Sequence, residues 1–166
     1  MSVEDDLYRI AQQEQRLQFD RFNPDVAWDI GCRLRETAQA HDAAVAIDVS
    51  LPGQQLFYFA MPGTSPNNAD WVRRKRNTVL RFFRSSYATG LLMSQRQTTL
   101  AAAYGLDFRD YADHGGSFPL QVAGQGCIGA VTVSGLPQRD DHSLVAEALA
   151  GLLGHDIADI ALAPEE

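Results

Sequence analysis

The residues best suited to bind or transform a small molecule gather between positions 113 and 147. His114 stands directly before the pair Gly115-Gly116, and His142 follows an aspartate pair that ends at Asp141. An imidazole can exchange a proton near neutral pH and can ligate a metal, whereas glycines that adopt positive φ let a ligand approach the backbone. The segment therefore predicts a binding site that includes these five residues.

A second chemical signal is Lys75, the only lysine of the chain. It lies four residues from both Trp71 and Val79, in the middle of the apolar face of a helix predicted over residues 71–84. An ammonium in that position must be paired, extend to solvent or meet a ligand, because burying it unpaired is costly. A structural ion pair and an anionic ligand both remain open. With Ser134, Lys75 completes the set of predicted ligand-binding residues.

Several motifs point away from other chemistries. The sequence from Gly124 to Gly129 matches G-x-G-x-x-G, but a predicted strand follows it where a dinucleotide site needs a helix, so it indicates a hairpin turn. There is no G-x-S-x-G motif and no zinc-ligand spacing of histidines. An oxidoreductase or a hydrolase therefore remains open without catalytic residues that the sequence can name, and no metal site is predicted. Cys32 and Cys127 lack C-x-x-C spacing and are expected to be reduced, buried thiols.

Charge and composition narrow the classes of partner. The formal net charge of -7 opposes binding to nucleic acid or to anionic membranes, although arginines 73, 74, 76, 81 and 84 form a basic face that could contact an acidic partner. No apolar run approaches membrane-spanning length, and the acidic N-terminus lacks the pattern of a secretory signal. We therefore expect a cytoplasmic protein with a small molecule as its partner.

The elements that position these residues follow from periodicity and turn chemistry. Helices are predicted over residues 3–17, 24–40, 71–84 and 140–153, with a further short helix over 106–112 and a loop over 63–68. Two hairpins are predicted from strands 43–49 with 56–61 and 118–122 with 127–134. Strand 56–61 has no polar face, so helices or another subunit should cover it on both sides. Gly31, inside a helix, suggests close approach by a neighbour.

A combined pattern of motifs resembles a known family. Its elements are Gly115-Gly116, Ser117-Phe118-Pro119-Leu120, Gly126 to Ser134, Gly135, Asp141-His142, and upstream Gly63-Thr64, Asn68, Trp71, Arg74-Lys75 and Ser85-Ser86-Tyr87. The chain is similar over nearly its whole length to the GlcG-like, or haem-degrading domain, family, in an uncharacterised and mostly microbial branch. The resemblance implies an α+β fold, a profilin-like sandwich with an antiparallel sheet flanked by helices, in a single domain over residues 1–166. It also implies homo-oligomers.

Three functions are compatible with these observations. The first is a small-molecule-binding domain in a homo-oligomer, with a pocket between the Lys75 helix, the His114 loop and the start of the last helix, whether or not it catalyses a reaction. The second, which the resemblance implies, is haem binding with slow haem degradation, using His114 or His142 as axial ligand; the chain has no C-x-x-C-H attachment motif. The third is a protein-interaction scaffold that uses the arginine face or an oligomer edge.

Overall fold

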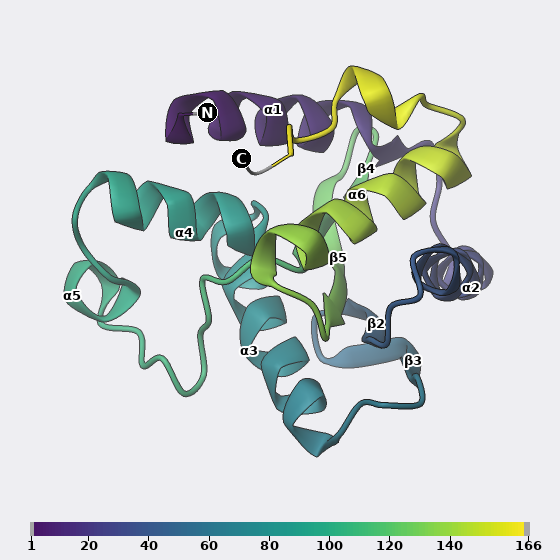
Figure 1. Cartoon of the computed structure of the whole chain (residues 1–166), viewed down its shortest axis with the longest axis horizontal. Helices are drawn as coiled ribbons and strands as arrows, with labels where there is room; N and C mark the ends of the chain where they lie inside the picture. The colour runs from purple at the N-terminus through teal and green to yellow at the C-terminus, as the bar shows by residue number, and fades with distance from the viewer. Residues whose placement is uncertain (1, 165–166) are drawn as a thin grey trace.

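The computed structural model describes residues 2–164, and Figure 1 shows their arrangement. In chain order the elements are α1 (Val3–Arg16), β1 (Gln18–Phe19), α2 (Pro24–Ala40), β2 (Ala46–Leu51), β3 (Gln54–Ala60), α3 (Pro66–Phe82), α4 (Ser86–Gln95), α5 (Leu100–Tyr104), β4 (Ser117–Val122), β5 (Gly126–Ser134), α6 (Gln138–Leu153) and a 3-10 turn, Ile157–Asp159.

One five-stranded sheet organises these elements, in the order β1-β4-β5-β2-β3. The two predicted hairpins form its centre and one edge, and Gly126 pairs with Val122 where the G-x-G-x-x-G motif turns the chain. The fold is the predicted α+β, profilin-like sandwich. The sheet is mixed and not purely antiparallel, because the two-residue strand β1 pairs in parallel with β4.

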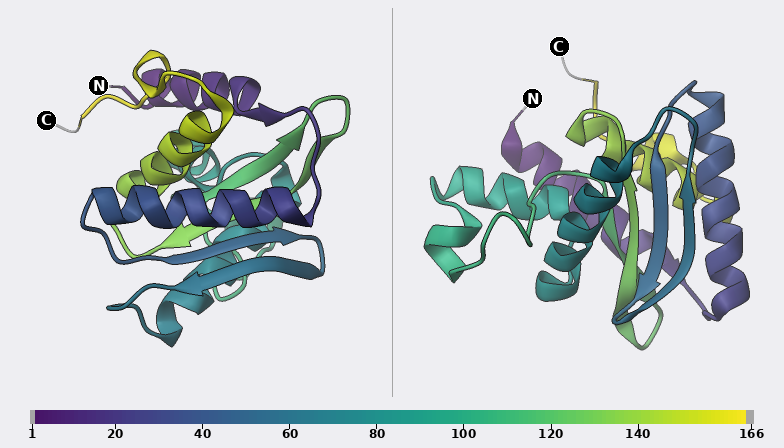
Figure 2. Two further views of the ribbon diagram at one scale, coloured as in Figure 1. Left: turned by 90° about the vertical axis from the view of Figure 1, so that its right-hand side faces the viewer. Right: turned by 90° about the horizontal axis from the view of Figure 1, so that it is seen from below.

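The two faces of the sheet have opposite chemistry. Figure 2 shows the sheet edge-on between α2 and α3. The face toward α2 and α6 is apolar and carries the main core, which includes Ile47, Val131 and Phe118. The face toward α3 buries polar side chains, among them Asp48 and Thr132. Such groups are tolerated in a core only when they are hydrogen-bonded. Thr132 bonds to Ser117 of β4 within the sheet, and Asp48 pairs with Arg76 of α3.

Local signals explain most of the helix boundaries. The side chain of Asn23 accepts a hydrogen bond from the N–H of Val26, with Pro24 at the first helical position, as predicted for α2. Helix α3 begins at Pro66 and not at residue 71, because Ser65 and Asn68 form a capping box inside the predicted loop. The predicted helix over 106–112 is wrong: the helix there is α5, which Gly105 ends in a left-handed conformation.

The strand predicted to be covered on both faces is an exposed edge strand. The ring of Phe57 in β3 packs directly over Gly31 of α2, which confirms the close approach expected at that glycine. The two residues that follow it are less well covered, because Tyr58 is 39% exposed and Phe59 is 37% exposed. Within the described residues, helices therefore cover this strand only in part.

Candidate functional site

A cavity of about 270 Å³ opens between the start of α3, the loop of residues 113–116 and the start of α6. This is the place where the sequence predicts a pocket. Five of the predicted ligand-binding residues line it, namely Lys75, His114, Gly115, Ser134 and Asp141. Three segments far apart in the sequence thus meet at one cavity. Gly116 and His142 are not among the lining residues.

Lys75 is held in an internal ion pair. Its side chain is almost fully buried, and its Nζ donates hydrogen bonds to the carbonyl oxygens of Gly115 at 3.0 Å and Val133 at 2.7 Å and to Oδ2 of Asp141 at 3.1 Å. Burial lowers the pKa of this ammonium, and the charge of Asp141 opposes that shift. An ammonium has three protons to donate, so no donor remains for a ligand. The structural ion pair, one of the two interpretations open from the sequence, is the one present.

The glycine pair serves the same ion pair. Gly116 has φ +130, and a Cβ there would collide with Nζ of Lys75 and with the carbonyl oxygen of Val133. A Cβ at Gly115 would collide with the carbonyl oxygen of Gln138 at the start of α6. The two glycines therefore let the loop close over the ammonium and against α6, and the group they admit is the protein's own lysine.

Asp141 ties the other side of the cavity to α6. Its Oδ1 accepts a hydrogen bond from the N–H of Leu136 at 3.0 Å, and its Oδ2 accepts one from the N–H of Gly135 at 3.4 Å. Burial raises the pKa of the carboxyl, while Lys75 and these N–H groups oppose the rise. One carboxylate thus orders the turn between β5 and α6 and neutralises the ammonium, so the pair adds no net charge to the cavity.

His114 lies at the rim of the cavity in an aromatic setting. Its ring centre is 5.3 Å from that of Trp71 and 5.7 Å from that of Phe108. Its Nδ1 is 3.7 Å from Oδ1 of Asp113, too far for a hydrogen bond, and is otherwise unpartnered within residues 2–164. Burial lowers the pKa of this imidazole, with Asp113 opposing the shift. A half-exposed, neutral imidazole therefore faces the cavity at pH 7.

A stacked arginine fixes the aromatic wall. The guanidinium of Arg74 lies 4.2 Å from the ring centre of Trp71 and 4.3 Å from that of Phe108, and its Nε donates to the carbonyl oxygen of Phe108 at 2.9 Å. This sandwich joins α3 to the loop before His114 through cation–π contacts. No sequence pattern indicated this role for Phe108, because it belongs to a stretch predicted as helix.

His142 is a core residue. It is 1% exposed, its Nε2 lies 2.7 Å from Oε1 of Gln13, and its ring packs against those of Tyr87 and Phe118. Because the Gln13 amide nitrogen donates to the carbonyl oxygen of Ile160, its oxygen accepts from His142, and Nε2 carries the proton. Burial lowers the pKa of His142 to about 3. The structure thus separates the two histidines that the sequence placed in one site.

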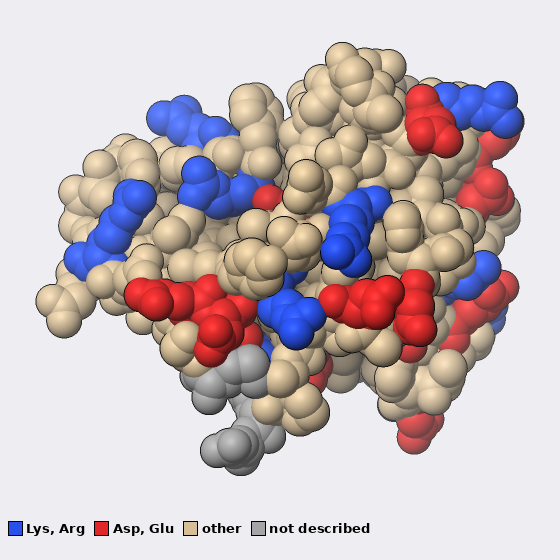
Figure 3. All heavy atoms as spheres, turned by 90° about the horizontal axis from the view of Figure 1, so that it is seen from above, with Lys and Arg blue, Asp and Glu red and all other residues tan. Residues whose placement is uncertain are grey.

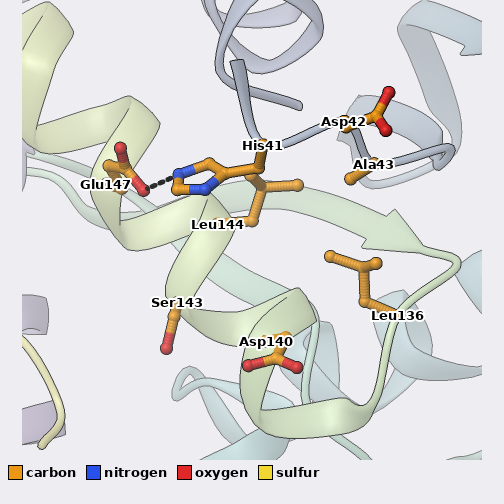
Figure 4. A pocket seen from close by; sticks show the side chains of 8 residues that line it. All are labelled: His41, Asp42, Ala43, Leu136, Asp140, Ser143, Leu144 and Glu147. Carbon is orange, nitrogen blue, oxygen red and sulfur yellow. Dashed lines mark hydrogen bonds and ion pairs between the residues drawn. The ribbon is translucent and has the colours of Figure 1, made fainter. Parts of the chain in front are cut away.

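A second cavity, of about 280 Å³, shares Leu136 with the first as a lining residue (Figure 4). His41 follows α2 and pairs with Glu147 of α6, with 2.7 Å between Nε2 and Oε2. Asp42 and Asp140 also line the cavity. Neither member of the pair was predicted from the sequence, because they are 106 positions apart and carry no motif.

The arginine face of α3 is largely occupied by partners within the chain. Arg73 pairs with Asp70 and Asp110, and Arg76 pairs with the buried Asp48. Figure 3 shows a different face, the one on the α1 side of the molecule, where exposed basic and acidic side chains lie next to one another. Since Arg74 is also stacked, the helix presents much less free positive charge than its sequence suggests.

Within residues 2–164, no group of three or more histidine, cysteine, aspartate or glutamate side chains is arranged to hold a metal ion. No helix in the same range is both long and apolar enough to span a membrane.

The sequence matches a known family model and is similar to proteins of several bacteria. A family model described as haem degrading protein HbpS-like matches residues 22–150. A UPF0303 protein of Edwardsiella ictaluri is 58% identical over 154 residues, covering 93% of this chain and 98% of the relative. A UPF0303 protein of Rhizobium meliloti is 58% identical over 156 residues, covering 94% of this chain and 95% of the relative.

Solved structures share the fold. The Ybr137w protein superposes with a TM-score of 0.83 at 29% identity, covering 89% of this chain and 87% of that one. HbpS superposes with a TM-score of 0.63 at 22% identity, covering 83% and 94%. PduOC, solved as a complex with haem, gives a TM-score of 0.64 at 18% identity, covering 75% and 89%.

Proposed function

The chain belongs to the HbpS-like family of haem degrading proteins, and we propose that it is a small-molecule-binding domain whose ligand occupies the cavity between α3, residues 113–116 and α6. The observation that carries the proposal is the meeting of five predicted residues from separate segments around one hollow. Residues this far apart in the sequence gather at a concave surface in the way that ligand sites are built.

The chemistry of the wall favours an uncharged, polar ligand over an anionic one, the alternative that Lys75 left open in the sequence. Lys75 and Asp141 neutralise each other and use all three ammonium protons internally. Within the described residues, the Ser134 hydroxyl makes no hydrogen bond, so it can bond to a polar group of a ligand. The neutral His114 and the indole of Trp71 supply an aromatic surface beside it. A volume of about 270 Å³ suits a small metabolite, since pockets for drug-sized ligands hold about 300–1,000 Å³.

Native mass spectrometry of the full chain purified from cells tests this proposal. The wild type should carry a bound mass that His114→Ala and Ser134→Ala each reduce at least about tenfold, equivalent to ~1.4 kcal/mol. His41→Ala, at the second cavity, is the matched control and should retain the mass. An unliganded wild type that no compound in a panel of neutral metabolites stabilises against heat would contradict the proposal.

Haem is the second candidate, and His114 is the residue that favours it. The half-exposed imidazole is neutral at pH 7 and has aromatic rings beside it, which suits an axial ligand, and Asp113 lies near its Nδ1. His142 does not fit, because its protonated Nε2 is bonded to Gln13 in the core. Haem would supply redox chemistry when bound, with His114 as its protein ligand. Hemin titration should then give a Soret shift that His114→Ala abolishes and His142→Leu retains; the reverse pattern would exclude this assignment.

We further propose that the chain acts as a homo-oligomer. The support is the apolar edge strand β3, whose two large aromatic side chains remain exposed in a single copy.

A further inference from the structure

We infer that β3 and the adjoining flank of α2 form the interface of a two-fold symmetric dimer, in which β3 pairs antiparallel with its own copy and the two sheets become continuous. This interface rests on the homo-oligomer proposed above and specifies which surface joins its copies. The surface shares no lining residue with the ligand cavity, so the failure of either proposal leaves the other standing.

The two edges of the sheet are protected very unequally. One edge is β1, a strand of two residues, which is too short to template pairing with another chain. The other edge is β3, seven residues with the sequence QQLFYFA, which contains no charge and no proline. Proteins usually protect an exposed edge strand with charged residues or proline, because its free N–H and C=O groups can pair with another strand. An unprotected edge of this length is expected to be covered.

The open hydrogen-bonding groups of β3 can be assigned from its pairing with β2. The N–H of Met61 donates to the carbonyl oxygen of Val45, so in an antiparallel ladder the alternate residues Phe59 and Phe57 also face β2. Tyr58 and Ala60 therefore direct their N–H and C=O groups outward. The irregularity in the ladder lies earlier, between Val49 and Ser50 of β2, and leaves this stretch regular.

The side chains beside the open edge form an apolar surface that includes α2. Trp28 is 64% exposed, and its ring meets that of Phe57 edge-on at 5.7 Å between centres. The guanidinium of Arg35 lies 5.5 Å from the ring centre of Phe59. An exposed aromatic surface next to unpaired backbone groups is typical of a protein interface, in which aromatic and arginine side chains are enriched.

A two-fold axis between Tyr58 and its own copy is compatible with the pairing of the strands and with the position of α2. It places Tyr58 opposite its own copy, with outward backbone groups facing each other, and sets Phe57 against the partner's Phe59 as a cross-strand aromatic pair. Since Phe57 packs on Gly31 and Phe59 lies under Arg35, the axis passes alongside α2 at the level of Cys32, between these two contacts.

The charges of α2 complement themselves about the same point. Asp29 and Arg35 are both exposed, carry opposite charge and stand three positions on either side of Cys32. In an antiparallel helix pair, each Asp29 then approaches the partner's Arg35, which gives two symmetric ion pairs. This self-complementarity favours a second copy of the chain over an unrelated strand, because an isologous interface must match its own surface.

Sedimentation velocity of the full chain tests the interface. Wild type should sediment as a dimer or a larger even-numbered assembly. Phe59→Lys places an ammonium beside Arg35 and in the aromatic pair, and should raise the dimer dissociation constant at least about 30-fold, equivalent to ~2 kcal/mol. Tyr8→Lys, which replaces an exposed aromatic residue on α1, is the matched control and should leave the assembly intact.

Crosslinking gives a readout that does not depend on the substitution at Phe59. With a short bis-maleimide, the wild type and Cys127→Ser should form a covalent dimer, whereas Cys32→Ser should not, because only Cys32 lies near the axis. A wild type that sediments as a monomer overturns the inference. So does an assembly that Phe59→Lys leaves unchanged and that cannot be linked through Cys32, since another surface would then join the copies.

Discussion

Removing the ammonium of Lys75 should destabilise the protein strongly, although the residue sits at a proposed binding site. In Lys75→Met, the carboxylate of Asp141 stays buried with only the N–H groups of Leu136 and Gly135, and two carbonyl oxygens lose their donor. Breaking a buried ion pair from one side costs about 3–5 kcal/mol. For a chain of this size that lowers Tm by roughly 6–20 °C.

Urea unfolding of four variants measures this effect: Lys75→Met, Asp141→Asn, their combination, and a control on the same helix. Lys75→Met/Asp141→Asn removes both charges while keeping an acceptor for the turn, so it should recover at least about 1.5 kcal/mol of the sum of the single losses. Arg81→Met, an exposed cation on the same helix, should change stability by less than about 0.5 kcal/mol. A loss below about 1 kcal/mol for Lys75→Met, or strictly additive single and double variants, would refute the ion pair as the anchor of this region.

Three further predictions concern other parts of the molecule. Because His142 has a pKa of about 3 when folded and about 6.5 when unfolded, its contribution is complete above pH 6.5 and is lost toward pH 3; lowering the pH from 7 to 5 should cost about 2 kcal/mol by urea unfolding, less in His142→Leu. Gly31→Ala should cost about 1–3 kcal/mol, because its Cβ would enter the ring of Phe57; an unchanged urea midpoint would disprove that contact. Phe83→Gly should stabilise the protein by about 1 kcal/mol despite the loss of a large side chain, since Phe83 is exposed and ends α3 at φ 57; a lower Tm would show that the ring contributes more than its backbone costs.

The parts of the fold that sequence could predict are those set by neighbouring residues. The Asn23-Pro24 start of α2 and the glycine turn between β4 and β5 depend on local chemistry, and both were predicted correctly. Helix boundaries were predicted wrongly where a local signal was missed or was compatible with two different structures. Ser65 caps α3 inside a stretch whose composition is also typical of a loop. Gly105 ends α5, whereas apolar spacing alone predicted a helix after this glycine.

The position of the cavity was predictable from the sequence, whereas the hydrogen bonds and ion pairs of its wall were not. Periodicity identified Lys75 as an ammonium on an apolar face, but the choice between ion pair and ligand required the position of Asp141, 66 residues away. The glycine pair was expected to let a ligand approach the backbone, but the groups that approach it in the structure are Nζ of Lys75 at Gly116 and the carbonyl oxygen of Gln138 at Gly115. The separation of His142 from His114 depends on where α6 meets α1, which no local pattern encodes.

A crystal structure of the protein taken directly from cells, without refolding, tests the central claim most directly. We predict ordered non-protein density in the cavity, in contact with Trp71 and within hydrogen-bond distance of the Ser134 hydroxyl, while Lys75 keeps its bonds to Gly115, Val133 and Asp141. A cavity that holds only water in such crystals, from protein that also carries no bound mass, would contradict the account.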